Sequence, residues 1–278
     1  MSKQNSLFIP RVSDTAPAHA EELQMEVLPP SAVEAQAKAE IDIQIATAHR
    51  YPRSMAAFKA RALDMATLDE DTAASCIYSR PVGKKNGRPE YAEGLSIRMA
   101  EIVGAAYGNL RVGASLIEQT DRFVRARGFA HDLESNFAAT SEVVESTVKR
   151  DGTPYDERMR VVVAKAALSK ALRDATFKVV PRAMCKPIAD EARKVAVGDA
   201  KTMDSRRAAV MQWIGKLGIE AERVFNALGV EGEEDIGQDQ LKVLVGLRTA
   251  IKDGDVTVDE AFPRIVKKAV VQETKEAE

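Results

Sequence analysis

Apolar positions change from a helical to a strand period near residue 108. From Leu95 to Ala106 the apolar residues recur every three or four positions, which predicts a helix with one buried face over residues 95–107. Gly108 and Asn109 follow, and both residue types suit the left-handed backbone that ends many helices. Beyond them apolar and polar residues alternate, which is the period of a strand. The pattern therefore predicts a helix followed by a β-sheet.

The clearest strand pattern runs from Arg122 to Asp132. Its even positions carry small apolar residues, which would let a helix lie close to that face. The opposite face suits single-stranded nucleic acid, because arginine neutralises phosphate and a ring can stack on any base. The alternative is that the two rings belong to the core and the two arginines are simply solvated. The odd positions in question are Phe123, Arg125, Arg127, Phe129 and His131.

Two similar segments, residues 111–119 and 137–148, flank this strand across short polar connections. Three consecutive strands joined in this way predict an antiparallel meander. A helix is expected from about residue 156 to 178, with acidic residues in its first turn and Pro181 after its end. Its expected buried stripe consists of Val161, Ala164, Leu168, Ala171, Leu172 and Ala175.

The same helix carries cations on another face. Lys165, Ser169 and Arg173 follow one another at intervals of four, and Lys170 lies nearby. A cationic helix face beside a cationic sheet face would form a groove. The alternative is that the charges are only the solvated side of the helix.

The order of helix, three strands and helix, ending in Ala167-Leu-Ser-Lys-Ala-Leu-Arg-Asp-Ala175, resembles the core of the single-strand annealing proteins. These include the phage RecT, Red-beta and Erf group and the eukaryotic Rad-type annealing proteins. In the Rad-type members a helix with an Ala-Leu-Lys-Arg-Ala-Leu-Arg run follows the meander and lines the DNA groove. Lys170 and Arg173 match basic positions of that run, whereas Ser169 stands where the family has lysine. Tyr107-Gly108 is similar to the Phe-Gly end of the family's preceding helix.

The resemblance implies a protein that binds single-stranded DNA and anneals complementary strands in phage homologous recombination, without ATP, metal or another cofactor. It also implies assembly into rings or filaments, which the free edges of a meander would favour. A small helical C-terminal domain would hold a partner, with an exonuclease or a single-strand-binding protein as candidates. The alternative function is that of a phage-type scaffold or inhibitor that acts through protein–protein contacts.

The expected DNA contacts combine the strand and the helix. Arg125, Arg127, Lys170 and Arg173 are the first phosphate contacts, supported by Lys165. Phe123 and Phe129 are candidate stacking platforms. A basic segment at residues 82–88 adds Lys84, Lys85 and Arg88, either as a phosphate-contacting loop or as a hairpin tip kept soluble by its charges. It lacks the Gly-Lys-Ser/Thr of a nucleotide-binding loop.

Composition agrees with an α+β fold, an antiparallel β-meander flanked by helices with a small helical C-terminal domain. The 278 residues are 45% apolar, 29% charged and only 5% aromatic, as in a globular, helix-rich protein. The formal net charge is −2, but residues 76–181 contain 17 basic and 13 acidic residues. Both flanking parts are acidic. The cations therefore gather on the predicted meander and its helices, as a nucleic-acid site requires.

Catalytic residues are not evident from the sequence. Acidic residues occur along the predicted sheet at Asp132, Glu134, Glu142 and Glu145, and His131 adjoins the first of them. Adjacent strand residues point to opposite faces, so His131 and Asp132 would not form a dyad. Two nearby acids are too few for a metal nuclease. We therefore expect no enzymatic activity.

Cys76 and Cys185 lack the spacing of a zinc site or a disulfide framework, and reduced structural thiols are expected. Residues 1–30 read as a disordered arm, 31–197 as the DNA-binding core, 198–270 as a helical C-terminal domain and 271–278 as a disordered tail. The N-terminus shows no signal-peptide pattern, and no apolar run is long enough to span a membrane. We expect a protein of the bacterial host cytoplasm.

Overall fold

The computed structural model describes residues 30–85, 88–149, 151–199 and 201–264. The expected disordered arm and tail lie outside these ranges, apart from Pro30. The chain divides into two units, one ending at Asp42 and one beginning at Ile43. The division falls inside the first helix, α1 (Pro30–Arg50).

The part of α1 before the division is exposed along almost all of its length. The spacing of Val33, Ala37, Ile41 and Ile45 predicts a helix with these residues buried. Val33 is 53% exposed, however, and Ala37 is exposed as well. This prediction is wrong for the N-terminal half of the helix. The reason is that the described residues of this unit offer the helix no second apolar surface.

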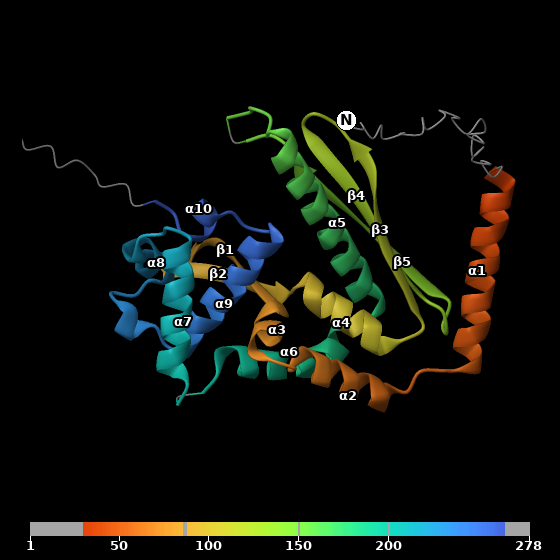
Figure 1. Cartoon of the computed structure of the whole chain (residues 1–278), viewed down its shortest axis with the longest axis horizontal. Coiled ribbons are helices and arrows are strands. Elements are labelled where there is room, and N and C mark those ends of the chain that lie inside the picture. The colour runs from red at the N-terminus through yellow and green to blue at the C-terminus, as the bar shows by residue number, and fades with distance from the viewer. Residues whose placement is uncertain (1–29, 86–87, 150, 200, 265–278) are drawn as a thin grey trace, which may run out of the picture. The chain divides into compact units, whose positions relative to one another are not determined.

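From Ile43 on, the chain forms a mixed α+β unit, and the predicted fold class is confirmed. A three-stranded antiparallel meander packs against helices, and a helical region follows it (Figure 1). The elements are α2 (Met55–Ala66), α3 (Glu70–Ser75), β1 (Ile77–Lys85), β2 (Arg88–Leu95), α4 (Ile97–Tyr107), β3 (Leu110–Gln119), β4 (Phe123–Asp132), β5 (Phe137–Ser146), α5 (Glu157–Val179), α6 (Arg182–Val197), α7 (Met203–Lys216), α8 (Ala221–Leu228), a 3₁₀ turn (Glu233–Asp235), α9 (Gln238–Asp253) and α10 (Val258–Ala261).

The meander has the order β3-β4-β5, and α5 lies along one of its faces (Figure 1). The even positions of β4 face that helix, as predicted: Val124, Ala126 and Ala130 are fully buried. At Gly128 the two backbones come so close that an added Cβ would overlap the carbonyl group of Ala171. Small residues on this face therefore set the distance between the helix and the sheet.

Residues 76–80 are predicted to form a strand and residues 82–88 a basic loop, and the structure has a two-stranded hairpin here. β1 and β2 pair antiparallel as far as Lys85 and Arg88, with an irregularity between Pro81 and Gly83. Residues 82–85 and 88 are therefore strand and not loop, and the connection at residues 86–87 lies outside the described ranges. The pairing continues because the bulge accommodates Pro81, which cannot donate a ladder hydrogen bond.

The C-terminal helices have a core of their own, and the hairpin takes part in it. Leu241, Leu244 and Leu247 of α9 are buried there, and Tyr78 and Tyr91 of the hairpin pack against the same cluster. Tyr91 also donates a 2.5 Å hydrogen bond to the carbonyl oxygen of Ala227 in α8. A second core, centred on α2, α4 and α6, supports the other end of the hairpin. The hairpin thus connects the meander's helices with the C-terminal helices.

A buried arginine fastens the turn between β4 and β5 to the segment before α2. Arg53 forms ion pairs with Asp132 and Glu134, the latter at 2.9 Å, and its guanidinium lies 3.9 Å from the Tyr107 ring centroid. Asn109, in the left-handed conformation at φ 49°, donates a 2.6 Å hydrogen bond to Glu134. The Arg53 side chain is only 8% exposed, so this network replaces water around three charges.

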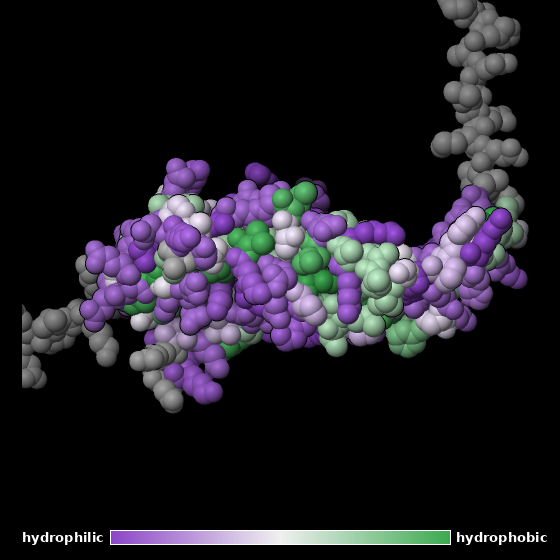
Figure 2. All heavy atoms as spheres, turned by 90° about the horizontal axis from the view of Figure 1, so that it is seen from below, coloured by the Kyte–Doolittle hydropathy of each residue, from purple (hydrophilic) through white to green (hydrophobic). Residues whose placement is uncertain are grey.

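Hydrophilic residues cover most of the surface seen from below, and hydrophobic ones appear in smaller separate areas (Figure 2). Among the described helices, none combines the length and the apolar composition needed to cross a membrane.

Candidate nucleic-acid interface

The face of the meander opposite α5 carries the cations and rings predicted from the sequence. We call it the open sheet face. Its side chains are half-exposed or exposed, in contrast to the buried even positions of β4. The strand register places Ser115 and Glu142 on either side of Arg127. The face comprises Arg111, Gly113, Ser115 and Glu118 of β3, Phe123, Arg125, Arg127, Phe129 and His131 of β4, and Thr140, Glu142 and Val144 of β5.

Both phenylalanines lie on this face and outside the buried core. The Phe129 ring covers Gly113 of β3, where an added Cβ would come within 2.5 Å of the ring. The Arg111 guanidinium lies 5.6 Å from the Phe129 ring centroid, and the Arg125 guanidinium lies 6.0 Å from that of Phe123. The rings are only half-buried, so each keeps an accessible surface beside a cation.

Two glutamates that sequence reasoning did not assign to the site neutralise part of its charge. Arg127 donates two hydrogen bonds to Glu142, at 2.7 and 3.0 Å, and Arg125 forms ion pairs with Glu118 and Glu142 at 3.2 and 3.7 Å. The hydrogen bond from Arg127 lowers the pKa of Glu142 from its ordinary value. With Arg111, three arginines face two carboxylates, which leaves one positive charge. Which arginine meets which glutamate depends on the register between neighbouring strands, and the sequence pattern alone does not predict that register.

The predicted groove between the open sheet face and α5 does not form. The sheet itself lies between Arg125 and α5, because the even positions of β4 contact the helix. Lys165 is exposed beside the β3 edge, with Leu116 and Gln119 as neighbours. Lys170 pairs with Glu145 of β5 on the helix-covered face of the sheet, and Lys170 and Arg173 are only 17% and 13% exposed. The four first-line cations therefore belong to two separate surfaces.

The hairpin places the remaining predicted cations elsewhere. Lys84 and Lys85 are exposed near the far end of β1. Arg88 pairs with Lys85 in the strand register, and its side chain lies outside the described part of the chain.

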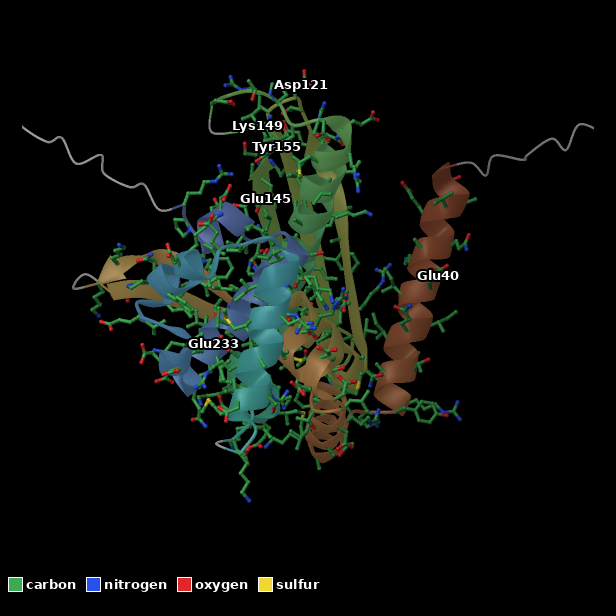
Figure 3. The ribbon with its side chains drawn as sticks, turned by 60° about the vertical axis from the view of Figure 1, so that its left-hand side comes forward. Glu40, Asp121, Glu145, Lys149, Tyr155 and Glu233 are labelled. Atoms are coloured by element: carbon green, nitrogen blue, oxygen red, sulfur yellow. The ribbon has the colours of Figure 1, made fainter. Side chains whose placement is uncertain are left out.

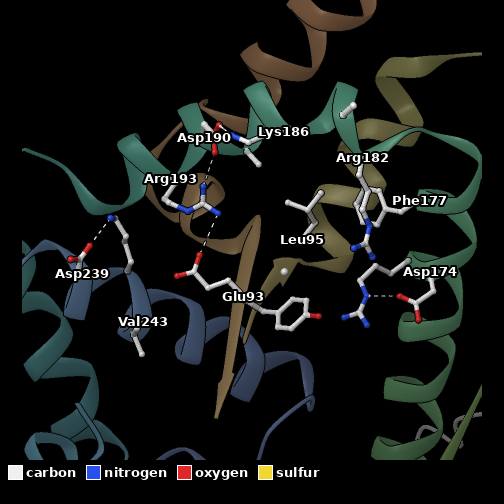
Figure 4. Close-up of a pocket in the computed structure, with 16 residues that line it drawn as sticks. Glu93, Leu95, Asp174, Phe177, Arg182, Lys186, Asp190, Arg193, Asp239 and Val243 are labelled. Atoms are coloured by element: carbon white, nitrogen blue, oxygen red, sulfur yellow. Dashed lines mark hydrogen bonds and ion pairs between the residues drawn. The ribbon is translucent and has the colours of Figure 1, made fainter. Parts of the chain in front are cut away.

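A cavity of about 1000 Å³ lies between the hairpin, α5, α6 and α9, and sequence reasoning did not predict it (Figure 4). We call it the hairpin cavity. Three of its cations, Arg182, Lys186 and Arg193, recur at helical spacing along α6, and this was the signal available in the sequence. Its full set of cations is Arg173, Arg182, Lys186, Arg193 and Lys242.

Carboxylates accompany most of these cations. Asp190 accepts hydrogen bonds from Lys186 at 2.6 Å and from Arg193 at 2.8 Å. Arg193 also forms an ion pair with Glu93 at 3.5 Å (Figure 4). The hydrogen bond from Lys186 lowers the pKa of Asp190. The cavity is thus polar and nearly charge-balanced.

The described ranges contain no group of three or more His, Cys, Asp or Glu residues placed to hold a metal ion. Cys76 and Cys185 are free and buried, and burial raises their pKa values to about 12 and about 11. Such thiols remain protonated at neutral pH and make poor nucleophiles.

Comparison of the chain with protein-family models, curated proteins and solved structures found no match.

Proposed function

We propose that the chain binds single-stranded DNA without sequence preference and promotes the annealing of complementary strands, in recombination of the phage type. What supports this most is the pairing of guanidinium groups with half-exposed rings on the open sheet face, at Arg111 with Phe129 and at Arg125 with Phe123. In such a pair the arginine can neutralise a phosphate while the neighbouring ring stacks on a base of the same nucleotide. Neither function depends on base identity.

An open face also suits annealing. A strand laid on a sheet is not enclosed, so the base edges that do not touch protein remain available to a second strand. The carboxylates beside Arg125 and Arg127 are exposed, and exposed ion pairs contribute little to stability. Phosphate can therefore replace Glu142 at these arginines without loss of the fold.

Replacing Arg125 and Arg127 together by alanine is expected to weaken oligonucleotide binding equally for all sequences. The slope of log affinity against log salt should become shallower by about 0.7 to 1 unit per arginine. The melting temperature should change little. The measurement is fluorescence anisotropy of a labelled oligonucleotide at several salt concentrations. Arg98→Ala is the matched control, since Arg98 is another exposed, ion-paired arginine, on α4. Unchanged affinity and slope in the double variant would show that the open sheet face is not the binding site.

Replacing Phe129 by alanine should separate stacking from packing. Loss of a base-stacking ring costs about 1–3 kcal/mol of binding free energy per base. Because the ring is half-exposed, the loss of stability should be smaller than the roughly 3–5 kcal/mol expected for Phe58→Ala, whose ring is fully buried. Binding and thermal melting of both variants test this. A Phe129 variant that unfolds as readily as the Phe58 variant would instead assign Phe129 to the core.

Assembly into rings or filaments forms part of this proposal. β3 and β5 are the edge strands of a three-stranded sheet, and unpaired edges favour pairing with another copy. Light scattering with and without oligonucleotide tests it, and a monomer under both conditions contradicts it. An exonuclease or a single-strand-binding protein remains the candidate partner of the C-terminal helices, and the bacterial cytoplasm the proposed location.

The second candidate function is a phage-type scaffold or inhibitor. The acidic composition of the chain on both sides of residues 76–181 favours it, since acidic helical ends suit protein partners better than nucleic acid. Failure to bind any oligonucleotide at low salt would favour this candidate over annealing. Shortening of the oligonucleotide after addition of Mg²⁺ would instead indicate a nuclease.

A further inference from the structure

Lys170 and Arg173 of α5 share one counter-ion from a distant part of the chain. Lys170 Nζ lies 3.4 Å from Asp255 Oδ1, and Arg173 Nη1 lies 3.2 Å from Asp255 Oδ2. Asp255 belongs to the turn after α9 and its side chain is only 11% exposed. Each carboxylate oxygen thus serves one of the two cations. Asp255 connects the C-terminal helices to the helix that packs on the meander.

Two further carboxylates complete the cluster. Lys170 also forms an ion pair with Glu145 of β5, labelled in Figure 3, at 2.9 Å. Arg173 forms one with Asp174 at 3.1 Å. The Arg173 guanidinium lies 5.0 Å from the Tyr78 ring centroid. Three carboxylates facing two cations carry a net charge of −1. While Asp255 is in place, the cluster therefore attracts no further anion.

Arg173 is nevertheless at the wall of the hairpin cavity. Lys170 and Asp255 do not line this cavity, so an anion there would reach Lys170 together with Arg173 only by taking the place of Asp255. A phosphodiester group presents two anionic oxygens, as a carboxylate does, and both bind guanidinium and ammonium groups by charge-assisted hydrogen bonds. Replacing the Asp255 carboxylate by a phosphodiester group keeps the two cations paired. The free-energy cost of the exchange is then mainly that of displacing the turn that carries Asp255.

We infer that Asp255 occupies the place of a nucleic-acid phosphate, and that a strand in the hairpin cavity displaces it to reach Lys170 and Arg173. This inference rests on the proposed binding of single-stranded DNA and adds a second, internally blocked contact to the open sheet face. Asp255 is an autoinhibitory group that lowers affinity for the strand. Its displacement couples strand binding to the position of the C-terminal turn.

The test is Asp255→Asn, which keeps the size of the side chain and removes its charge. The variant is expected to bind a labelled oligonucleotide about tenfold more tightly or better, because close charge pairs of this kind contribute at least about that factor. Glu222→Gln is the matched control. It makes the same change in net charge at an exposed residue, whose side chain has no ion pair within the described structure. A general effect of net charge would raise affinity equally in both variants.

The gain should disappear when Asp255→Asn is combined with Arg173→Gln. A variant Asp255→Asn that binds no better than Glu222→Gln overturns the inference and leaves the proposed function standing, provided that the parent binds. If neither parent nor variant binds at low salt, the proposed function and the inference fall together. Should Asp255→Asn fail to fold, Arg173→Gln alone must weaken binding several-fold in the parent. An unchanged affinity would then overturn the inference.

Discussion

Replacing Arg53 by alanine is expected to lower the free energy of unfolding by about 3–5 kcal/mol, because it leaves two carboxylates without their buried partner. Asp132 and Glu134 accept hydrogen bonds from Arg53, and their side chains are only 10% and 22% exposed. The variant also loses the contact with the Tyr107 ring. Urea unfolding followed by circular dichroism measures the change. Arg53→Lys is the control, since it keeps the charge but cannot bridge both carboxylates with a planar fork. It should lose part of this stability.

The network around Arg53 also makes the stability of the fold depend on pH. Burial alone would raise the pKa values of Asp132 and Glu134. Hydrogen bonds from Arg53, together with those from Ser135 and the Glu134 backbone to Asp132 and from Asn109 to Glu134, outweigh burial, and both pKa values are lowered. A lowered pKa stabilises the folded state above the ordinary carboxyl range, about pH 4, and this contribution is lost as the pH falls below it. The parent should therefore lose stability more steeply below about pH 5 than Arg53→Ala does. Equal slopes would contradict the role of Arg53.

Replacing Gly128 by alanine should be the most disruptive single-methyl change in the meander. The added carbon would overlap the carbonyl of Ala171 and lie 2.8 Å from the amide nitrogen of Leu172, and both are backbone atoms that cannot rotate away. Overpacking of this kind costs about 1–3 kcal/mol and sometimes more, because the helix has to move from the sheet. Thermal and urea unfolding measure the loss.

Gly104→Ala is the matched control for this variant. Gly104 lies within α4, and an added Cβ would have only Leu110 near it, at an ordinary 3.8 Å. Alanine is the better helix former, so this variant should be neutral or more stable by up to about 1 kcal/mol. If Gly128→Ala proved equally harmless, α5 would not lie as close to β4 as the structure places it.

Most of the backbone elements around the site could be predicted from local pattern. The change of period after Tyr107 and the left-handed residues Gly108 and Asn109 correctly located the end of α4. The alternation along β4 correctly separated the buried face from the face with rings and cations. These features depend on neighbours within a few residues, so the sequence contains them directly.

The predicted groove does not form, because the helix that carries Lys170 and Arg173 packs on the face of β4 opposite its arginines. Small residues on the even positions of β4 already implied that α5 lies on that face. The cations at the odd positions therefore had to lie on the opposite side of the sheet from Lys170 and Arg173. The partners of these two residues, Asp255 and Tyr78, are remote in sequence, and no local pattern identifies them.

What the sequence determined by itself is the α+β class, the meander, and the face of β4 on which arginines and phenylalanines gather, because periodicity is a property of the backbone conformation. Only the tertiary structure decided which cations are accessible. Cross-strand register paired Arg127 with Glu142, and the packing of α9 beside the hairpin brought Asp255 to Lys170 and Arg173. Charges act over distances in space, and contacts between residues far apart in the chain arise only when the whole fold brings them together.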